Sequence, residues 1–308
     1  MEEFRSFVRS NVCLADYTRL GIGGTVEYFA EPESESQLLL LLDRCRYRNL
    51  SVRVIGAGSN VLVPNKGLAG IVISLNKPAF CTIEHNASSR EPLITAGAGV
   101  KLVQFITEAV TFGLGGVEGL IGIPGTIGGV LCDNAGTSND NIGQWVESVR
   151  VANLDGTIST LSKNEITFGY RSSSLDTGVI LSAVFRLELD DVSELSKRMQ
   201  KFWIVRKSQQ PDSGLRLVMA FNSTKTGTSA SDLIDQVNLK GTQIGGAVIS
   251  DHNSNFIIVE PAINGNKNSE QNNSGRDIVN DIKRLIQLVQ DRILEKTDVE
   301  IEPSLRVW

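Results

Sequence analysis

The feature that most constrains the fold is a glycine-rich stretch in the middle of the chain, Gly122-Ile123-Pro124-Gly125-Thr126-Ile127-Gly128-Gly129. Five of its eight residues are Gly or Pro, and a segment with so few side chains usually lets something approach its backbone closely. A second such segment follows a predicted strand and reads Gly56-Ala57-Gly58-Ser59-Asn60. Together they predict two loops whose backbone amides surround the phosphates of a cofactor.

The segment at 56–60 does not match the dinucleotide fingerprint, because an apolar run at 61–63 replaces the third glycine. It also lacks the lysine of a Walker A loop. By itself it is consistent with either a tight structural turn or a ligand loop. Two amide-rich loops without GxGxxG favour a flavin site over a classical nicotinamide site.

Bulk properties exclude several classes of protein. The 308 residues suffice for two domains, and the net charge of −5 argues against non-specific binding to nucleic acid or anionic membranes. The four cysteines are scattered, which argues against a disulfide framework or a metal site. We find neither a signal peptide nor an apolar run near the roughly 18 residues of a membrane span. These features predict a cytoplasmic protein with no membrane insertion.

Hydrophobic periodicity predicts mixed helices and strands. We expect strands at 51–55, 70–75, 93–96, 179–189, 247–250 and 256–259, and a hairpin of 146–154 with 158–161 around Asp155-Gly156. We expect helices at 100–110, 191–207, 231–237 and 277–296, and one that begins at a Ser34/Gln37 capping box. The 191–207 helix should carry Val192, Leu195, Met199, Phe202 and Trp203 on its apolar face. A domain boundary falls near 191–206, and 264–275 is a polar surface loop.

Arg171 lies in a short turn-like run, Phe168-Gly169-Tyr170-Arg171-Ser172-Ser173. Its guanidinium could clamp a carboxylate or phosphate, or polarise a carbonyl in a transition state. A surface arginine beside a core tyrosine would give the same pattern. The motif alone leaves both interpretations open.

These motifs, in this order, resemble the UDP-N-acetylenolpyruvoylglucosamine reductase (MurB) family. The resemblance covers nearly the whole chain and is carried by residues 11–24, 56–63, 122–136, 168–173, 206–211, 229–241 and 250–256. It implies an α+β fold with an FAD-binding domain of the vanillyl-alcohol-oxidase (PCMH) type at 15–190. A smaller C-terminal α+β substrate domain would occupy 191–308.

The resemblance also implies a function. NADPH would reduce FAD, and the flavin would pass hydride to the enolpyruvyl group of a UDP-sugar, giving UDP-N-acetylmuramate for peptidoglycan and cell-wall synthesis. Arg171 would be catalytic, Tyr170 and Asn134 would bind substrate, and the two glycine-rich segments would bind FAD.

The chain departs from the family pattern at two catalytic positions. Met219 stands where the family has a Ser or Cys proton donor, and Ser304 stands where it has a glutamate. A thioether has no proton to give. Three explanations compete. In the first, Ser213 or Ser223 replaces the proton donor and Glu302 replaces the glutamate. In the second, the protein binds FAD but reduces a different substrate. In the third, it is a flavin- or nucleotide-sugar-binding relative that no longer catalyses the reaction.

Overall fold

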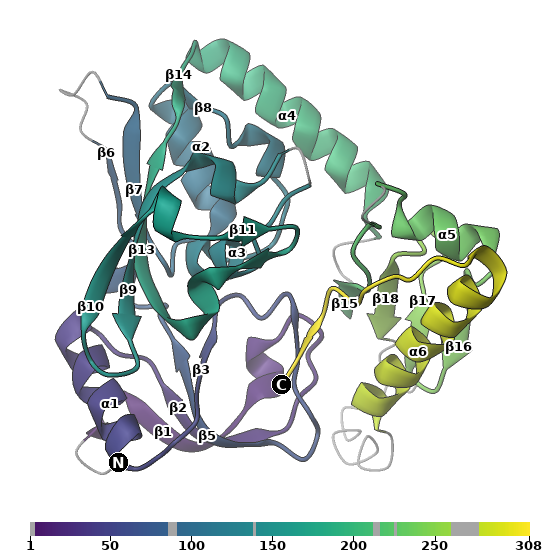
Figure 1. Cartoon of the computed structure of the whole chain (residues 1–308), viewed down its shortest axis with the longest axis horizontal. Coiled ribbons are helices and arrows are strands. Elements are labelled where there is room, and N and C mark those ends of the chain that lie inside the picture. Colours follow the sequence, from purple (N-terminus) through teal and green to yellow (C-terminus); the bar gives the residue numbers. More distant parts are fainter. Residues whose placement is uncertain (1–3, 86–90, 138–139, 212–215, 225–226, 260–276) are drawn as a thin grey trace, which may run out of the picture. The chain divides into compact units, whose positions relative to one another are not determined.

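The computed structural model describes residues 4–85, 91–137, 140–211, 216–224, 227–259 and 277–308. The backbone mixes helices with mainly antiparallel strands, which is an α+β fold (Figure 1). It forms two compact units. The first comprises 1–12, 26–57 and 69–206, and the second 13–25, 58–68 and 207–308. The predicted loop at 264–275, and Ser213, lie outside the described residues.

Among the described residues, the strands of the first unit form two sheets and two short two-stranded ribbons. An antiparallel sheet has the order β10-β9-β13-β7-β6, formed by Ile158–Ser162, Val146–Asn153, Gly178–Arg186, Leu93–Gly97 and Ile83–His85 (Figure 1). A second sheet has the order β1-β2-β5-β3, formed by Val8–Cys13, Thr25–Ala30, Leu68–Ser74 and Val52–Ile55. The ribbons pair β11 with β12 and β14 with β8, at Phe168–Gly169, Ser172–Ser173, Glu188–Leu189 and Leu114–Gly115. The predicted hairpin at 155–156 is confirmed.

Helices α1 (Glu35–Tyr47) and α2 (Leu102–Thr111) bury one face each in the core of the first unit. The Ser34 hydroxyl caps α1 by accepting from the Gln37 amide at 3.2 Å, and the Gln37 side chain accepts from the Glu33 amide at 2.7 Å. The predicted capping residue therefore starts this helix. In α2 the buried residues recur at helical spacing, as the periodicity indicated.

Helix α4 (Val192–Gln209) forms where it was predicted, but most of its apolar face is exposed. Only Leu195 of the five predicted residues is buried, whereas Val192, Phe202 and Trp203 are 45%, 42% and 45% exposed. Periodicity identifies the helix but cannot tell whether a neighbouring element covers its apolar side.

The second unit has its own sheet and core. Its sheet has the order β15-β18-β17-β16, formed by Arg216–Met219, Phe256–Val259, Ala247–Ile249 and Gln243–Ile244. Helices α5 (Ala230–Gln236) and α6 (Ile278–Thr297) complete it, both close to their predicted bounds. Seven residues of α6 at helical spacing are buried.

Two early segments of the chain belong to the core of the second unit. Leu20, Ile22 and Leu62 pack with the apolar residues of its sheet and of α6. Strand β4 (Val61–Leu62) pairs in parallel with β19 (Arg306–Val307) near the C-terminus. A single boundary near residue 190 therefore does not describe the packing, because segments 13–25 and 58–68 contribute to the later unit. The assignment of FAD binding to residues 15–190 and of substrate binding to residues 191–308 stays a prediction.

Within the described part of the chain, none of the helices combines the length and apolar character needed to cross a membrane.

Candidate functional site

The structure brings the two glycine-rich segments together at one point in the first unit. Gly56 follows the end of β3, and a Cβ built there would collide with the Thr126 hydroxyl oxygen. The close approach predicted for both segments is therefore in part an approach of one segment to the other.

Other glycines of these segments are also approached by atoms of the chain itself. Gly58 has φ +60°, and a Cβ there would collide with the carbonyl oxygen of Tyr17. A Cβ at Gly125 would lie 2.7 Å from Val130 Cγ1, and one at Gly128 would lie 3.1 Å from Ala98 Cβ. Gly129 differs, because outside its chain neighbours and its own helix backbone only the Thr126 hydroxyl, among the described residues, comes within 4 Å of its Cβ position, at 3.6 Å.

The last residues of the central stretch are helical, which corrects the prediction of a continuous loop. Helix α3 (Ile127–Cys132) contains Gly128 and Gly129. The pair is unfavourable for helix propensity, but Ile127, Val130 and Leu131 are buried at helical spacing, and this packing outweighs propensity. The amides of Ile127 and Gly128 donate to the carbonyls of Val100 (2.8 Å) and Ala98 (2.9 Å). These two amides are therefore already satisfied within the chain.

Arg171 occupies a tight turn between β11 and β12, with φ +54°. A left-handed conformation is uncommon for a residue with a Cβ, and it persists only where the surroundings impose it. The Arg171 Nε is buried without a hydrogen-bond partner among the described residues. Because a buried unpaired N–H is costly, this atom is suited to an acceptor that belongs to a ligand.

Asn134 holds the Arg171 turn in place. Its side chain is 5% exposed, donates from Nδ2 to the Gly169 carbonyl (2.8 Å) and accepts at Oδ1 from the Gly143 amide (3.0 Å). The Ser173 hydroxyl adds a bond to the Cys132 carbonyl at 3.1 Å. The segment after α3 is thus tied directly to the turn that carries Arg171. The predicted substrate contact by Asn134 is untested, and its observed bonds are structural.

A cavity of about 660 Å³ opens beside this turn. Its size falls in the range of ligand pockets, and Tyr170 at its wall is 41% exposed. Amide side chains, two aromatic rings and two cations line it: Asn134, Thr137, Asn141, Gly143, Gln144, Lys163, Asn164, Ile166, Phe168, Gly169, Tyr170 and Arg171. The cavity therefore brings together Asn134, from the stretch at 122–136, and Tyr170 and Arg171, from the run at 168–173.

Arg206 is a functional candidate to which sequence reasoning gave no role. Its Nη2 donates to the Gly119 carbonyl at 2.8 Å, and its Cδ lies 2.9 Å from where a Cβ at Gly122 would stand. Burial lowers the pKa of Arg206, as does the charge of Arg171, while Asp140 acts in the opposite direction. The signal available in the sequence was the glycine at position 122, which the structure shows with φ +82° and with the Arg206 side chain where a Cβ would stand.

In the second unit, the segments that carry Met219 and Ser304 lie side by side. Phe221 and Pro303 form an antiparallel bridge, in which the Asn222 amide donates to the Glu302 carbonyl (2.9 Å) and the Ser304 amide to the Ala220 carbonyl (2.8 Å). Met219, at the end of β15, and Ser304 are both half-buried. The backbone pairing between these two predicted catalytic positions is therefore in place without the expected side chains.

The residues predicted to replace the missing side chains, Ser223 and Glu302, are more exposed to solvent than Met219 and Ser304. Ser223 and Glu302 are both exposed, and Glu302 lies two residues before Ser304.

Family models match both parts of the chain. Residues 26–162 match an FAD binding domain, and residues 209–308 match the C-terminal domain of UDP-N-acetylenolpyruvoylglucosamine reductase. The chain is similar over its whole length to the reductases of that name from Rhodopirellula baltica (35% identity, 100% of this chain and 94% of the relative) and Bacillus pumilus (33%, 97% and 93%).

A solved structure gives the same result. The crystal structure of UDP-N-acetylenolpyruvylglucosamine reductase (MurB) from Thermus caldophilus aligns with a TM-score of 0.76 and 31% identity, over 98% of this chain and 100% of the other. The agreement in sequence and fold extends through both units. The chain belongs to the UDP-N-acetylenolpyruvoylglucosamine reductase (MurB) family.

Proposed function

We propose that this protein is an FAD-dependent reductase that uses NADPH to reduce the enolpyruvyl group of UDP-N-acetylglucosamine enolpyruvate in the cytoplasm. The observation that carries the proposal is Arg171, held in a strained turn beside the cavity with a buried, unpartnered Nε. Full-length similarity to reductases of this name supports the choice of substrate.

Residues of the two glycine-rich segments and two arginines fit a phosphate-bearing flavin. Outside its own helix backbone and chain neighbours, Gly129 has only the Thr126 hydroxyl near its Cβ position among the described residues. The guanidiniums of Arg171 and Arg206 have Nε atoms without acceptors among the described residues. FAD, when bound, would supply the hydride-transfer chemistry that protein side chains lack. We assign its binding to Gly56–Asn60, Gly122–Thr126, Gly128 and Gly129.

Arg171 would bind and orient the substrate carboxylate. Its planar guanidinium can donate two parallel hydrogen bonds to the two oxygens of a carboxylate and stabilise negative charge that develops on the substrate. Asn134 would keep the turn in register through its bonds to Gly169 and Gly143. Tyr170, which is exposed at the cavity wall, would contact the sugar nucleotide.

Proton delivery is the step for which the chain offers the fewest groups. Met219 cannot donate a proton, whereas the adjacent segment carries the Ser304 hydroxyl and the Glu302 carboxyl. The second candidate function, a flavin- or nucleotide-sugar-binding relative without turnover, rests on these two substitutions. Reduction of a different substrate also remains compatible with them.

The test is anaerobic flavin spectroscopy in two steps. The purified chain should carry FAD, NADPH should bleach the flavin absorbance, and the enolpyruvyl UDP-sugar should restore it. Arg171→Met should bind FAD and bleach normally but recover much more slowly. A chain that bleaches but never recovers with this substrate is a binding or altered-specificity relative. A colourless chain that ignores added FAD contradicts the whole proposal.

A further inference from the structure

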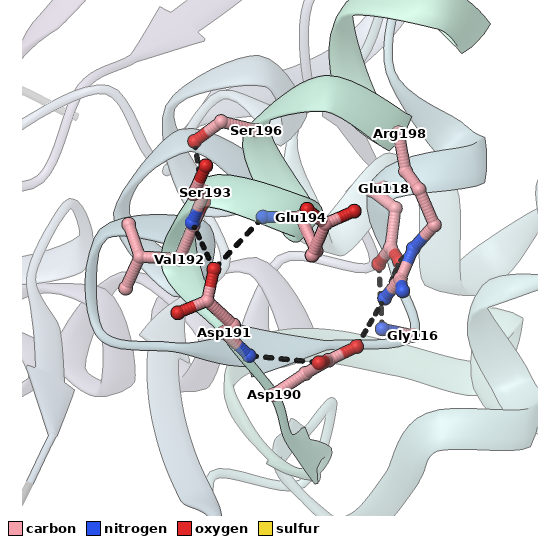
Figure 2. Close-up of polar contacts among 9 residues, drawn as sticks. All are labelled: Gly116, Glu118, Asp190, Asp191, Val192, Ser193, Glu194, Ser196 and Arg198. Atoms are coloured by element: carbon pink, nitrogen blue, oxygen red, sulfur yellow. Dashed lines mark hydrogen bonds and ion pairs between the residues drawn. The ribbon is translucent and has the colours of Figure 1, made fainter.

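Helix α4 is attached to the segment at 116–122 near its N-terminal end. Asp191 caps the helix by accepting from the amides of Ser193 (2.9 Å) and Glu194 (3.1 Å), as Figure 2 shows. Farther along α4, Arg198 forms ion pairs at 2.8 Å with Glu118 and with Asp190 (Figure 2). The Glu118 carboxylate is 7% exposed and also accepts from the Gly116 amide at 2.6 Å. The helix is therefore fixed in register against this segment.

Arg206 lies on the same helix eight residues after Arg198, about two turns farther on. It reaches the same segment again, because its Nη2 binds the Gly119 carbonyl and its methylene stem covers Gly122. Gly119 is equally constrained, since a Cβ there would collide with the Asp140 carboxylate. Gly122, the first residue of the central stretch, thus makes room for Arg206, and Gly119, three residues before it, makes room for Asp140.

The charges of the two arginines of α4 are balanced very differently. Arg198 has two carboxylates within 4 Å, whereas no described Asp or Glu lies within that distance of Arg206 or Arg171. Both Arg206 and Arg171 bury an Nε without an acceptor. Each is near enough to the other for the charge of Arg171 to lower the pKa of Arg206. Both side chains are half-buried, and Asp140 favours the charged form of Arg206 without lying within 4 Å of it. A bound anion would supply the acceptor that both Nε atoms lack.

We propose that Arg206, together with Arg171, forms a binding site for an anionic oxygen group, a phosphate or a carboxylate. The glycines at 119 and 122 serve this site indirectly, by admitting the arginine that meets the anion. The inference rests on the proposed function only for the identity of the molecule that carries the anionic group. That molecule is either FAD, through its pyrophosphate, or the UDP-sugar substrate.

A purely structural role for Arg206 makes a different prediction. If it only ties α4 to the Gly119 carbonyl, its loss should resemble the loss of Arg198, with lower stability and unchanged affinity for anions. If Arg206 binds an anion, Arg206→Gln should weaken anion binding because it removes the positive charge. Arg206→Lys should restore part of the affinity, because lysine keeps the charge but lacks the planar guanidinium.

The experiment compares Arg206→Gln, Arg206→Lys and the matched control Arg198→Gln. Thermal unfolding of the apo protein is followed with increasing inorganic phosphate at constant ionic strength. FAD and the enolpyruvyl UDP-sugar are then titrated separately. We expect phosphate to raise the Tm of the wild type and of Arg198→Gln but not of Arg206→Gln. Affinity for one natural ligand should fall roughly 10- to 100-fold in Arg206→Gln, as for a lost charge-assisted hydrogen bond.

Each outcome distinguishes the possibilities. Weaker FAD binding alone assigns the site to the cofactor pyrophosphate, and weaker substrate binding alone assigns it to the substrate. If the wild type binds neither ligand but phosphate still raises its Tm through Arg206, the anion site stands and the proposed function fails. If Arg206→Gln lowers the Tm without changing affinity for phosphate, FAD or substrate, the anion site is refuted.

Discussion

The Arg171 turn of the first unit and the Met219–Ser304 pair of the second unit were both predicted to carry chemistry, and they differ in what has been kept. Around Arg171 the side chain, the strained backbone and the supporting bonds from Asn134 are all present. Around Met219 and Ser304 the backbone pairing is present, while the expected side chains are replaced. Main-chain hydrogen bonds do not depend on side-chain identity, so a scaffold can outlast the chemistry it once positioned.

The largest expected effect comes from restoring the side chains of the second unit. Met219→Ser with Ser304→Glu should raise turnover of the enolpyruvyl UDP-sugar by about 10²–10⁴, the usual contribution of a positioned proton donor. Steady-state NADPH oxidation with this substrate measures it. Ser223→Ala is the matched control in the wild-type background, because it removes residual activity only if Ser223 has become the donor. An unchanged rate in the double variant would mean that these positions are not catalytic.

A smaller effect should follow from breaking the scaffold of the first unit. Asn134→Ala removes both bonds of a buried amide and leaves the Gly169 carbonyl and Gly143 amide without it, at a cost of about 2 kcal/mol in the free energy of unfolding. Urea unfolding measures this cost. Affinity for substrate should fall while affinity for FAD changes little, because Arg171 is displaced.

Asn164→Ala, at the wall of the same cavity, is the control for that experiment. It should leave the free energy of unfolding nearly unchanged, because Asn164 is exposed. Equal losses in the two variants would show that Asn134 has no special part in holding the turn.

The smallest effect concerns the charge balance beside Arg206. Burial raises the pKa of Asp140, Arg206 lowers it in part, and Glu118 raises it. A carboxyl whose folded pKa exceeds its unfolded pKa favours the folded state when protonated, so this contribution is lost as pH rises through the folded pKa. Asp140→Asn should remove this loss and flatten stability against pH in that range.

Urea midpoints measured from acidic to neutral pH test the Asp140 prediction. Arg206→Gln should shift the same feature to higher pH, since it removes the charge that favours ionised Asp140. A pH profile identical in the wild type and Asp140→Asn would contradict the assignment.

Local signals predicted many elements well. The Ser34 cap, the Asp155-Gly156 turn and the apolar period of α6 each depend on residues close in sequence, and each matches the structure. Helix α3 was missed because burial of its apolar residues outweighs the helix-breaking tendency of Gly128 and Gly129. The exposure of the α4 face was missed because it depends on which elements pack nearby.

The sequence by itself determined the family, the order of the motifs and the two substituted catalytic positions, because these are properties of residue identity and spacing. Only the tertiary structure decided what the glycines accommodate. Gly56 meets Thr126, and Gly122 meets Arg206, 84 residues away in the chain. A glycine shows that space is needed, but its identity carries no information about the atom that fills the space. That atom is fixed by long-range packing, as is the pairing of 220–222 with 302–304.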